Sequence, residues 1–237
     1  MPRLSLHEIT LYDDNDFLVV NKPPFLSTLE DRVSPSNLLK IVREEYPEAT
    51  VGHRLDKETS GVLVIAKNAE AYKWISAQFE TRQVTKIYHA IVNGRHDLQQ
   101  KTVDASIEKL SDGTVKISSK GKPSLTVFQT LKIFQKHTWV EARPVTGRMH
   151  QIRIHLKLLK CPISGDNEYG GTPLLLSSIK PGFKISKNEE EEPFIKRFAL
   201  HAVKIQFTSL NGNVIEVEAP YPKDFKALLN QLHKNNR

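Results

Sequence analysis

The chain has 237 residues, of which 39% are hydrophobic and 26% are charged, which is ordinary for a globular protein with one large domain or two small ones. Its formal net charge of +7 favours a polyanionic partner, with nucleic acid ahead of an anionic membrane surface. The single cysteine, Cys161, excludes an internal disulfide and a multi-cysteine zinc site, and its apolar neighbours predict a buried small hydrophobe.

The first ten residues, MPRLSLHEIT, contain no apolar segment of signal-peptide length. No apolar run elsewhere approaches the length of a membrane span. A soluble cytoplasmic protein that does not act at a membrane is therefore expected, and the single cysteine is compatible with a reducing compartment.

Strand and helix patterns alternate in the first part of the chain. The strand pattern FLVVNK stops at Pro23-Pro24, which cannot continue a ladder. The run GVLVIAK is rich in β-branched residues, which is typical of a strand buried on both faces. Apolar residues at helical spacing indicate two helices, the first of them N-capped by Ser36. Strands are predicted at 17–22 and 61–67, and helices at 36–46 and 69–82.

Strand patterns dominate the second part of the chain. Strands are predicted at 86–94, 114–119, 124–134, 138–145, 199–209 and 213–220, and helices at 150–160 and 223–236. The last two strands are joined through an Asn-Gly hairpin signal. The glutamate-rich stretch 184–197 is expected to be a solvated, mobile loop. Runs of strands with a few helices predict an α+β fold with a mixed, mostly antiparallel sheet.

Asp56 is the first candidate for chemistry. It stands between Arg54 and Lys57, just before the turn Thr59-Ser60-Gly61 that opens a buried strand. A surface loop with a local ion pair is the simpler interpretation. The mouth of a strand is also where sites are built, and a carboxylate held there would need a fixed cation to stay ionised.

Two arginines in RPVTGRMHQIRIHL could supply that cation. Arg148 begins the predicted helix and Arg153 follows five residues later, so the two side chains face different ways. One could hold an inner carboxylate while the other meets phosphate, since a guanidinium suits both. The competing interpretation is an amphipathic helix with a basic outer face. Tyr88 in KIYHAIVNG is either a half-buried core tyrosine or a ring on which a nucleobase stacks.

Several other chemistries lack their sequence patterns. His150 and His155 are five residues apart rather than four and do not share a helix face, so a metal site is not expected. The sequence has no P-loop, no GxGxxG and no GxSxG, the patterns of nucleotide-binding and serine-hydrolase sites.

Three stretches together resemble one family. HRLDKETSGVLVIAKN is similar to the signature of the RluA-type pseudouridine synthases, GRMHQIRIHL resembles their second motif, and FALHAVKIQF with VEAPYP resembles the third. KIYHAIVNG, KPPFLST and GDNEYGG fall in the family's order and spacing. The resemblance covers about residues 11–222.

The resemblance implies the pseudouridine synthase catalytic fold, a long mixed sheet with flanking helices and a central RNA cleft. It implies isomerisation of a uridine in structured tRNA or large-subunit rRNA to pseudouridine, without cofactor or metal, by a monomer. Asp56 would be the catalytic aspartate, Arg148 its partner and Tyr88 the stacking ring. On the substrate side, Leu200 would pack beneath the base, and phosphates would be met by Arg54, Lys57 and the basic helix with His150 and Arg153.

The sequence also departs from the family. Met149 stands where threonine or serine is usual, so a local hydroxyl contact is expected to be missing. The family often carries an N-terminal S4 RNA-binding domain, whereas catalytic-domain sequence begins here near Leu11, so we expect a single catalytic domain over residues 1–237. The alternatives are a non-catalytic RNA-binding or RNA-folding factor with the same fold, and a metal-dependent hydrolase acting on RNA.

Overall fold

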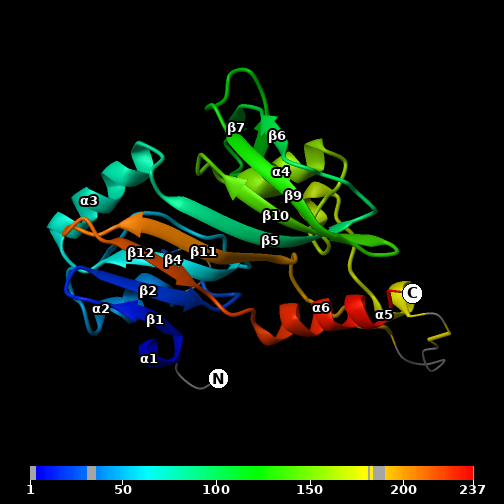
Figure 1. The fold of residues 1–237 in the computed structure, drawn as a ribbon, viewed down its shortest axis with the longest axis horizontal. Coiled ribbons are helices and arrows are strands. Elements are labelled where there is room, and N and C mark those ends of the chain that lie inside the picture. Colours follow the sequence, from blue (N-terminus) through cyan, green and yellow to red (C-terminus); the bar gives the residue numbers. More distant parts are fainter. Residues whose placement is uncertain (1–3, 31–35, 181, 184–189, 237) are drawn as a thin grey trace. The chain divides into compact units, whose positions relative to one another are not determined.

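A computed structural model describes residues 4–30, 36–180, 182–183 and 190–236 (Figure 1). The chain forms two compact units. The first contains residues 1–88 and 201–220, and the second contains residues 89–200 and 221–237. Among the described residues, no helix is both long and apolar enough to cross a membrane.

The first unit is built on a strand that is buried along its whole length. β4 (Ser60–Ala66) has seven buried residues, as its β-branched sequence predicts. It pairs antiparallel with β2 and β3 and parallel with β11, so this sheet is mixed. The elements of the unit are α1 (Leu6–Ile9), β1 (Thr10–Asp13), β2 (Phe17–Lys22), α2 (Leu38–Arg43), β3 (Thr50–Val51), β4, α3 (Ala69–Glu80), the start of β5 (Thr85–Asn93), β11 (Leu200–Thr208) and β12 (Val214–Glu218).

The parallel pairing explains the glycine after Ser60. Gly61 lies opposite Ala202 with φ of +117°, and a Cβ at Gly61 would stand 2.1 Å from the Ala202 carbonyl oxygen. Only glycine allows both the backbone conformation and the approach of the two strands. Beside it, the Ser60 hydroxyl lies 2.9 Å from Nδ1 of buried His201, whose Nε2 lies 3.2 Å from the Ala219 carbonyl oxygen. This buried network fixes the start of β4.

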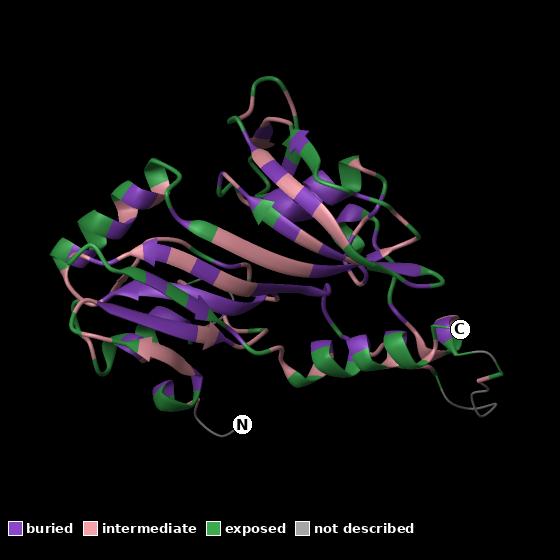
Figure 2. Ribbon diagram, viewed as in Figure 1, coloured by how far each residue is buried: buried purple, intermediate pink, exposed green. Residues whose placement is uncertain are grey.

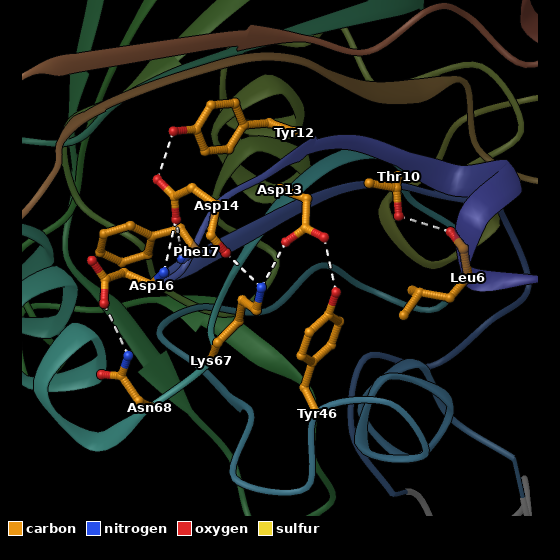
Figure 3. Close-up of polar contacts among 10 residues, drawn as sticks. All are labelled: Leu6, Thr10, Tyr12, Asp13, Asp14, Asp16, Phe17, Tyr46, Lys67 and Asn68. Carbon is orange, nitrogen blue, oxygen red and sulfur yellow. Dashed lines mark hydrogen bonds and ion pairs between the residues drawn. The ribbon is translucent and has the colours of Figure 1, made fainter.

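Lys67, which directly follows the C-terminal end of β4, forms several polar contacts. Lys67 donates from Nζ to the Asp13 carboxylate at 2.9 Å (Figure 3), and the same nitrogen lies 4.2 Å from the centroid of the Tyr46 ring. The Tyr46 hydroxyl donates to the other Asp13 oxygen at 2.8 Å. The neighbouring Asp14 accepts from the backbone N–H of Phe17, which shapes the β1–β2 turn. These contacts tie the β1–β2 hairpin to the end of β4.

The second unit carries a sheet of β5, β10, β9 and β6, in that order. β9 pairs antiparallel with both β10 and β6, and β7 and β8 form a separate two-stranded sheet. Figure 2 shows buried and exposed residues alternating along the C-terminal helix α6, as its amphipathic sequence predicts. The elements are β6 (Lys101–Asp104), β7 (Ile107–Lys109), β8 (Val115–Ile117), β9 (Leu125–Ile133), β10 (His137–Pro144), α4 (Gln151–Leu158), η1 (Asn167–Tyr169), α5 (Leu176–Ile179) and α6 (Lys223–Lys234).

The predicted α+β class and the mixed, mostly antiparallel pairing are confirmed. All the predicted helices and strands are present, with ends that shift by a few residues. The predicted helix cap is wrong. Asn37, rather than Ser36, caps α2, because its side chain accepts from the Lys40 N–H at 2.9 Å. The glutamate-rich stretch lies partly outside the described residues, at 184–189.

The competing interpretation of the helix after Arg148, an amphipathic helix with a basic outer face, describes only its last turn, where Lys157 is exposed. Six consecutive residues of α4, from Gln151 to Leu156, are buried. The helix is therefore a packing element of the second unit. Its buried polar residues Gln151, Arg153 and His155 have internal hydrogen-bond partners.

Candidate functional site

The segment from His53 to Asp56 is held by alternate residues. The His53 ring lies against Phe79 with 4.8 Å between centroids, and its Nε2 accepts from the Val64 N–H at 3.2 Å. Leu55 is buried in the core. The side chains of His53 and Leu55 therefore anchor the segment on which Arg54 and Asp56 lie. Arg54 is exposed and Asp56 is partly buried.

Two buried side chains fix the backbone around Asp56. The hydroxyl of Thr28 donates to the Leu55 carbonyl at 2.9 Å and accepts from its N–H at 3.2 Å. Lys22 is fully buried, and its ammonium donates to the Lys57 carbonyl at 3.2 Å. The Asp56 carbonyl accepts from the Thr59 N–H at 3.0 Å, which closes the turn into β4. Asp56 is thus held by backbone contacts on both sides, on a rigid element.

Tyr88 lies near this carboxylate. Burial raises the pKa of the Tyr88 phenol, and the negative charge of Asp56 raises it further. Both residues belong to the first unit, so the structure brings together two of the predicted site residues. Tyr88 is partly buried and packs against the core of the unit. A carboxylate beside an aromatic ring can act on a base that is stacked on that ring.

Lys86 precedes Tyr88 by two residues on β5 and therefore lies on the same face of that strand. Burial lowers the pKa of its ammonium to about 8. The Lys86 ammonium stands 5.8 Å from the centroid of Phe79, the ring against which His53 packs. The sequence indicated Lys86 only as a neighbour of Tyr88. Its burial could not be predicted, because it depends on contact with Phe79 of α3 in the folded chain.

His53 gives the first unit an acid-sensitive group. Burial and, to a smaller extent, the charge of Lys86 lower the His53 pKa from 6.5 to about 3. Between these values the unfolded chain binds a proton that the folded protein does not, so the free energy of unfolding falls as pH drops through this window. The contribution is up to about 1.4 kcal/mol per pH unit. In urea melts, His53→Gln should show a smaller loss of stability between pH 6.5 and 4 than wild type, and equal losses would contradict this assignment.

In the second unit, a buried amide organises the segment that carries Arg148. Oε1 of Gln151 accepts from the Thr146 hydroxyl at 2.7 Å and from the Arg148 N–H at 3.0 Å. Its Nε2 donates to the Leu125 carbonyl and the Thr126 hydroxyl at 3.0 and 2.9 Å. The amide thus uses both donors and both lone pairs. Sequence reasoning missed this role of Gln151, although the residue lies inside the second motif.

Arg148 itself is exposed, and its Nε donates to the Pro123 carbonyl at 3.3 Å. Met149, where a hydroxyl residue was expected, packs instead against the small apolar cluster that contains Ile154. His150 adopts a left-handed backbone with φ of 52°, and its Nδ1 lies 2.8 Å from the Tyr169 hydroxyl. The left-handed residue turns the chain sharply between Arg148 and α4.

The interpretation of Arg153 as a phosphate-binding residue does not fit its environment. Arg153 is buried and forms a bidentate pair with Asp166 at 2.7 and 2.8 Å. Its Nη2 also donates to Glu168 at 2.8 Å, and its guanidinium lies 4.3 Å from the centroid of the Phe198 ring. Arg153 is therefore the arginine that holds an inner carboxylate. The carboxylate belongs to the GDNEYGG stretch, which α4 secures in this way.

Leu200 is buried at the start of β11. The preceding segment is fixed by Arg197, which is itself buried, donates to the Leu200 carbonyl at 3.1 Å and pairs with Asp224 of α6 at 2.8 Å. The sequence offered no signal for this pair, because its members lie 27 residues apart.

The remaining histidine and cysteine candidates have structural roles. His155 is fully buried, with Nδ1 3.0 Å from the Thr126 hydroxyl and Nε2 3.1 Å from the Ala105 carbonyl oxygen. Among the residues with described positions, no group of three His, Cys, Asp or Glu side chains is placed to hold a metal ion. Cys161 is buried, as predicted, and burial raises its thiol pKa to about 12, so it is a poor nucleophile.

Comparisons with known proteins identify the family to which the chain belongs. Residues 16–158, which include both anchored segments, match the family model described as RNA pseudouridylate synthase. The chain is 32% identical over 235 residues to ribosomal large subunit pseudouridine synthase C of Vibrio cholerae, covering 97% of this chain and 71% of that protein. It is 33% identical over 238 residues to ribosomal large subunit pseudouridine synthase D of Vibrio vulnificus, covering 95% and 70%.

A solved structure is similar over nearly the same length. Human RNA pseudouridylate synthase domain containing 4 superposes with a TM-score of 0.78 at 26% identity, covering 96% of this chain and 94% of that one. The family match extends over more than half of the chain, and the curated relatives extend over nearly all of it. The chain therefore belongs to the RNA pseudouridine synthases, the isomerases that convert uridine in RNA to pseudouridine.

Proposed function

We propose that this synthase isomerises a uridine of ribosomal large-subunit RNA and that Asp56 is its catalytic carboxylate. The observation that carries the proposal is the position of Asp56, fixed by its backbone neighbours at the mouth of β4 with its charge beside Tyr88. The choice of RNA rests on the names of the bacterial relatives, which are large-subunit synthases. The net charge of +7 suits a polyanionic substrate.

The chemistry requires a positioned carboxylate and no electron acceptor. The N1–C1′ bond breaks, the base rotates and rejoins the sugar through C5, the hydrogen at C5 leaves as a proton, and the freed N1 takes up a proton. Atoms and electrons balance within the substrate. The Asp56 carboxylate can assist as a nucleophile at the sugar or as a base. The target uridine leaves its stack to reach the site, and the Tyr88 ring then supports the extruded base.

Arg148 is the proposed partner of Asp56, because a carboxylate that is shielded from water needs a fixed cation to remain ionised. The buried Gln151 amide accepts from the Arg148 N–H and so fixes the backbone position from which the arginine side chain extends. Arg54 and Lys57 are exposed and are proposed to contact phosphates. Leu200 and His150 are proposed to line the substrate side of the second unit. Arg153 supports this side from within.

The two compact units are proposed to act as one catalytic domain and as a monomer. A cytoplasmic location is proposed because the relatives are named as ribosomal RNA enzymes.

Substrate class is tested with [5-³H]uridine-labelled transcripts of large-subunit rRNA and, separately, of pooled tRNA. Tritium release from rRNA in the presence of EDTA is the expected result. Release confined to tRNA would move the substrate to the other RNA class. A metal-dependent hydrolase would instead cut the transcripts without releasing tritium from C5, and EDTA would abolish that cutting.

Tyr88 substitutions separate stacking from hydroxyl chemistry. Tyr88→Phe should retain most of the rate of tritium release, because the ring remains. Tyr88→Ala should lose about ten- to a hundredfold, the range for removal of one base–aromatic stack. Equal losses in both variants would assign the role to the hydroxyl instead, and urea melts check that both variants are folded.

A further inference from the structure

Phe25 is an exposed aromatic residue with an unusual backbone. Its side chain is 54% exposed, and its φ is +65°, in the left-handed region that favours glycine. A single exposed apolar residue is ordinary in proteins. A bulky residue held in a left-handed conformation is not, and such strain persists only where the surroundings determine it.

The surroundings that determine it are the same contacts that fix the Asp56 segment. The fully buried Lys22 ammonium donates to the carbonyls of Pro23 and Leu26, on either side of Phe25, at 3.0 and 2.8 Å. The same nitrogen donates to the Lys57 carbonyl at 3.2 Å. The Lys22 nitrogen therefore joins the loop that contains Phe25 to the residue that follows Asp56.

Thr28 supplies a second link between the two segments. Its hydroxyl contacts both the N–H and the carbonyl of Leu55, so residues 26–28 run beside residues 55–57. With both ends of its loop anchored, the backbone of Phe25 has little freedom. Its ring is held in solvent on the loop next to the proposed catalytic carboxylate, within the first unit.

We propose that Phe25 is a base-stacking residue, whose ring packs on a nucleobase of the RNA next to the target uridine. When a uridine is extruded, the neighbouring base loses a stacking partner and exposes an apolar face. An aromatic ring on a rigid loop covers such a face without regard to sequence, because every base has one. The inference rests on the proposed function, which places the RNA at Asp56.

The backbone conformation makes a clean experiment possible. Phe25→Gly and Phe25→Asn remove the ring and suit the left-handed backbone better, so both should leave the melting temperature unchanged or raised. Both should lower kcat/KM for tritium release about tenfold or more. Phe25→Trp keeps a stacking ring and should stay within a fewfold of wild type.

Two controls match these variants. Gln100→Gly removes another side chain from a left-handed position, with φ of +50°, in the second unit. Tyr72→Ala removes another exposed ring, from α3. Both should retain wild-type kcat/KM.

Tritium release and RNA retention on filters together distinguish failure of the stacking role from failure of the proposed function. If wild type releases tritium, Asp56→Asn does not, and Phe25→Gly is at least tenfold slower, both proposals stand. If wild type and Phe25→Gly release at equal rates, the stacking role is overturned and the proposed function survives. If wild type releases no tritium, the proposed function fails, and RNA binding on filters then tests whether Phe25 contacts RNA. Weaker RNA binding by Phe25→Gly would support the contact, and equal binding would overturn it.

Discussion

Asp56→Asn is expected to lower the rate of tritium release about 10³-fold or more while leaving the fold and RNA binding intact. Asparagine has nearly the same shape as aspartate but cannot act as a nucleophile or a base at neutral pH. The turn that contains Asp56 is held by its backbone carbonyl, which accepts from Thr59, and that contact does not depend on the carboxylate. The melting temperature of the variant should therefore stay close to that of wild type.

RNA binding by Asp56→Asn separates an enzyme from a binding protein. An enzyme should lose turnover and keep filter binding, or bind slightly tighter because a negative charge has been removed near phosphate. A pure RNA-binding or RNA-folding factor has no turnover to lose. Asp112→Asn removes a fully exposed carboxylate from the turn between β7 and β8 and serves as the charge-matched control.

Arg148→Ala is expected to reduce turnover about 10²-fold or more, because Asp56 would lose the cation that keeps it ionised. The backbone N–H of residue 148 would still donate to Gln151, so alanine should preserve the local conformation. If the two residues act as a pair, the double variant with Asp56→Asn should be little slower than Asp56→Asn alone. The measurement is tritium release by the two single variants and the double variant.

Arg143→Ala is the matched arginine control for this prediction. Arg143 is exposed, lies on β10 in the same unit and pairs with Glu141 at 2.7 Å. An exposed pair of this kind contributes little to stability, and its loss should leave turnover close to wild type. Near-wild-type turnover by Arg148→Ala would sink the proposed pairing.

Local patterns were sufficient for most of the fold. β4 was predicted from the apolar, β-branched run Val62–Ile65, and α3 and α6 were predicted from apolar residues at helical spacing. Short edge strands such as β3 and β6 were not predicted, because two to four residues show too little periodicity to be recognised. The burial of α4 was not predicted either. Its arginine, glutamine and histidine are buried because they have partners from distant parts of the chain.

The same limit applies to the site. Asp56 and Tyr88 could be selected because each stands in a recognisable motif. Lys22 could not, since its role depends on three carbonyls that converge only in the folded chain. Arg153 was expected to meet phosphate because the resemblance implied a basic RNA-binding helix, whereas in the structure it pairs with Asp166, 13 residues away. Charge indicates what a side chain can bind, and the fold decides what it does bind.

The most direct test of the central claim is tritium release from [5-³H]uridine-labelled large-subunit rRNA by wild type and Asp56→Asn side by side. Isomerisation frees the hydrogen at C5, so the label reports the bond change itself. We expect wild type to release a fixed number of tritium atoms per transcript and Asp56→Asn to release none above background. Release that persists in Asp56→Asn, or no release by wild type from rRNA, would contradict the claim.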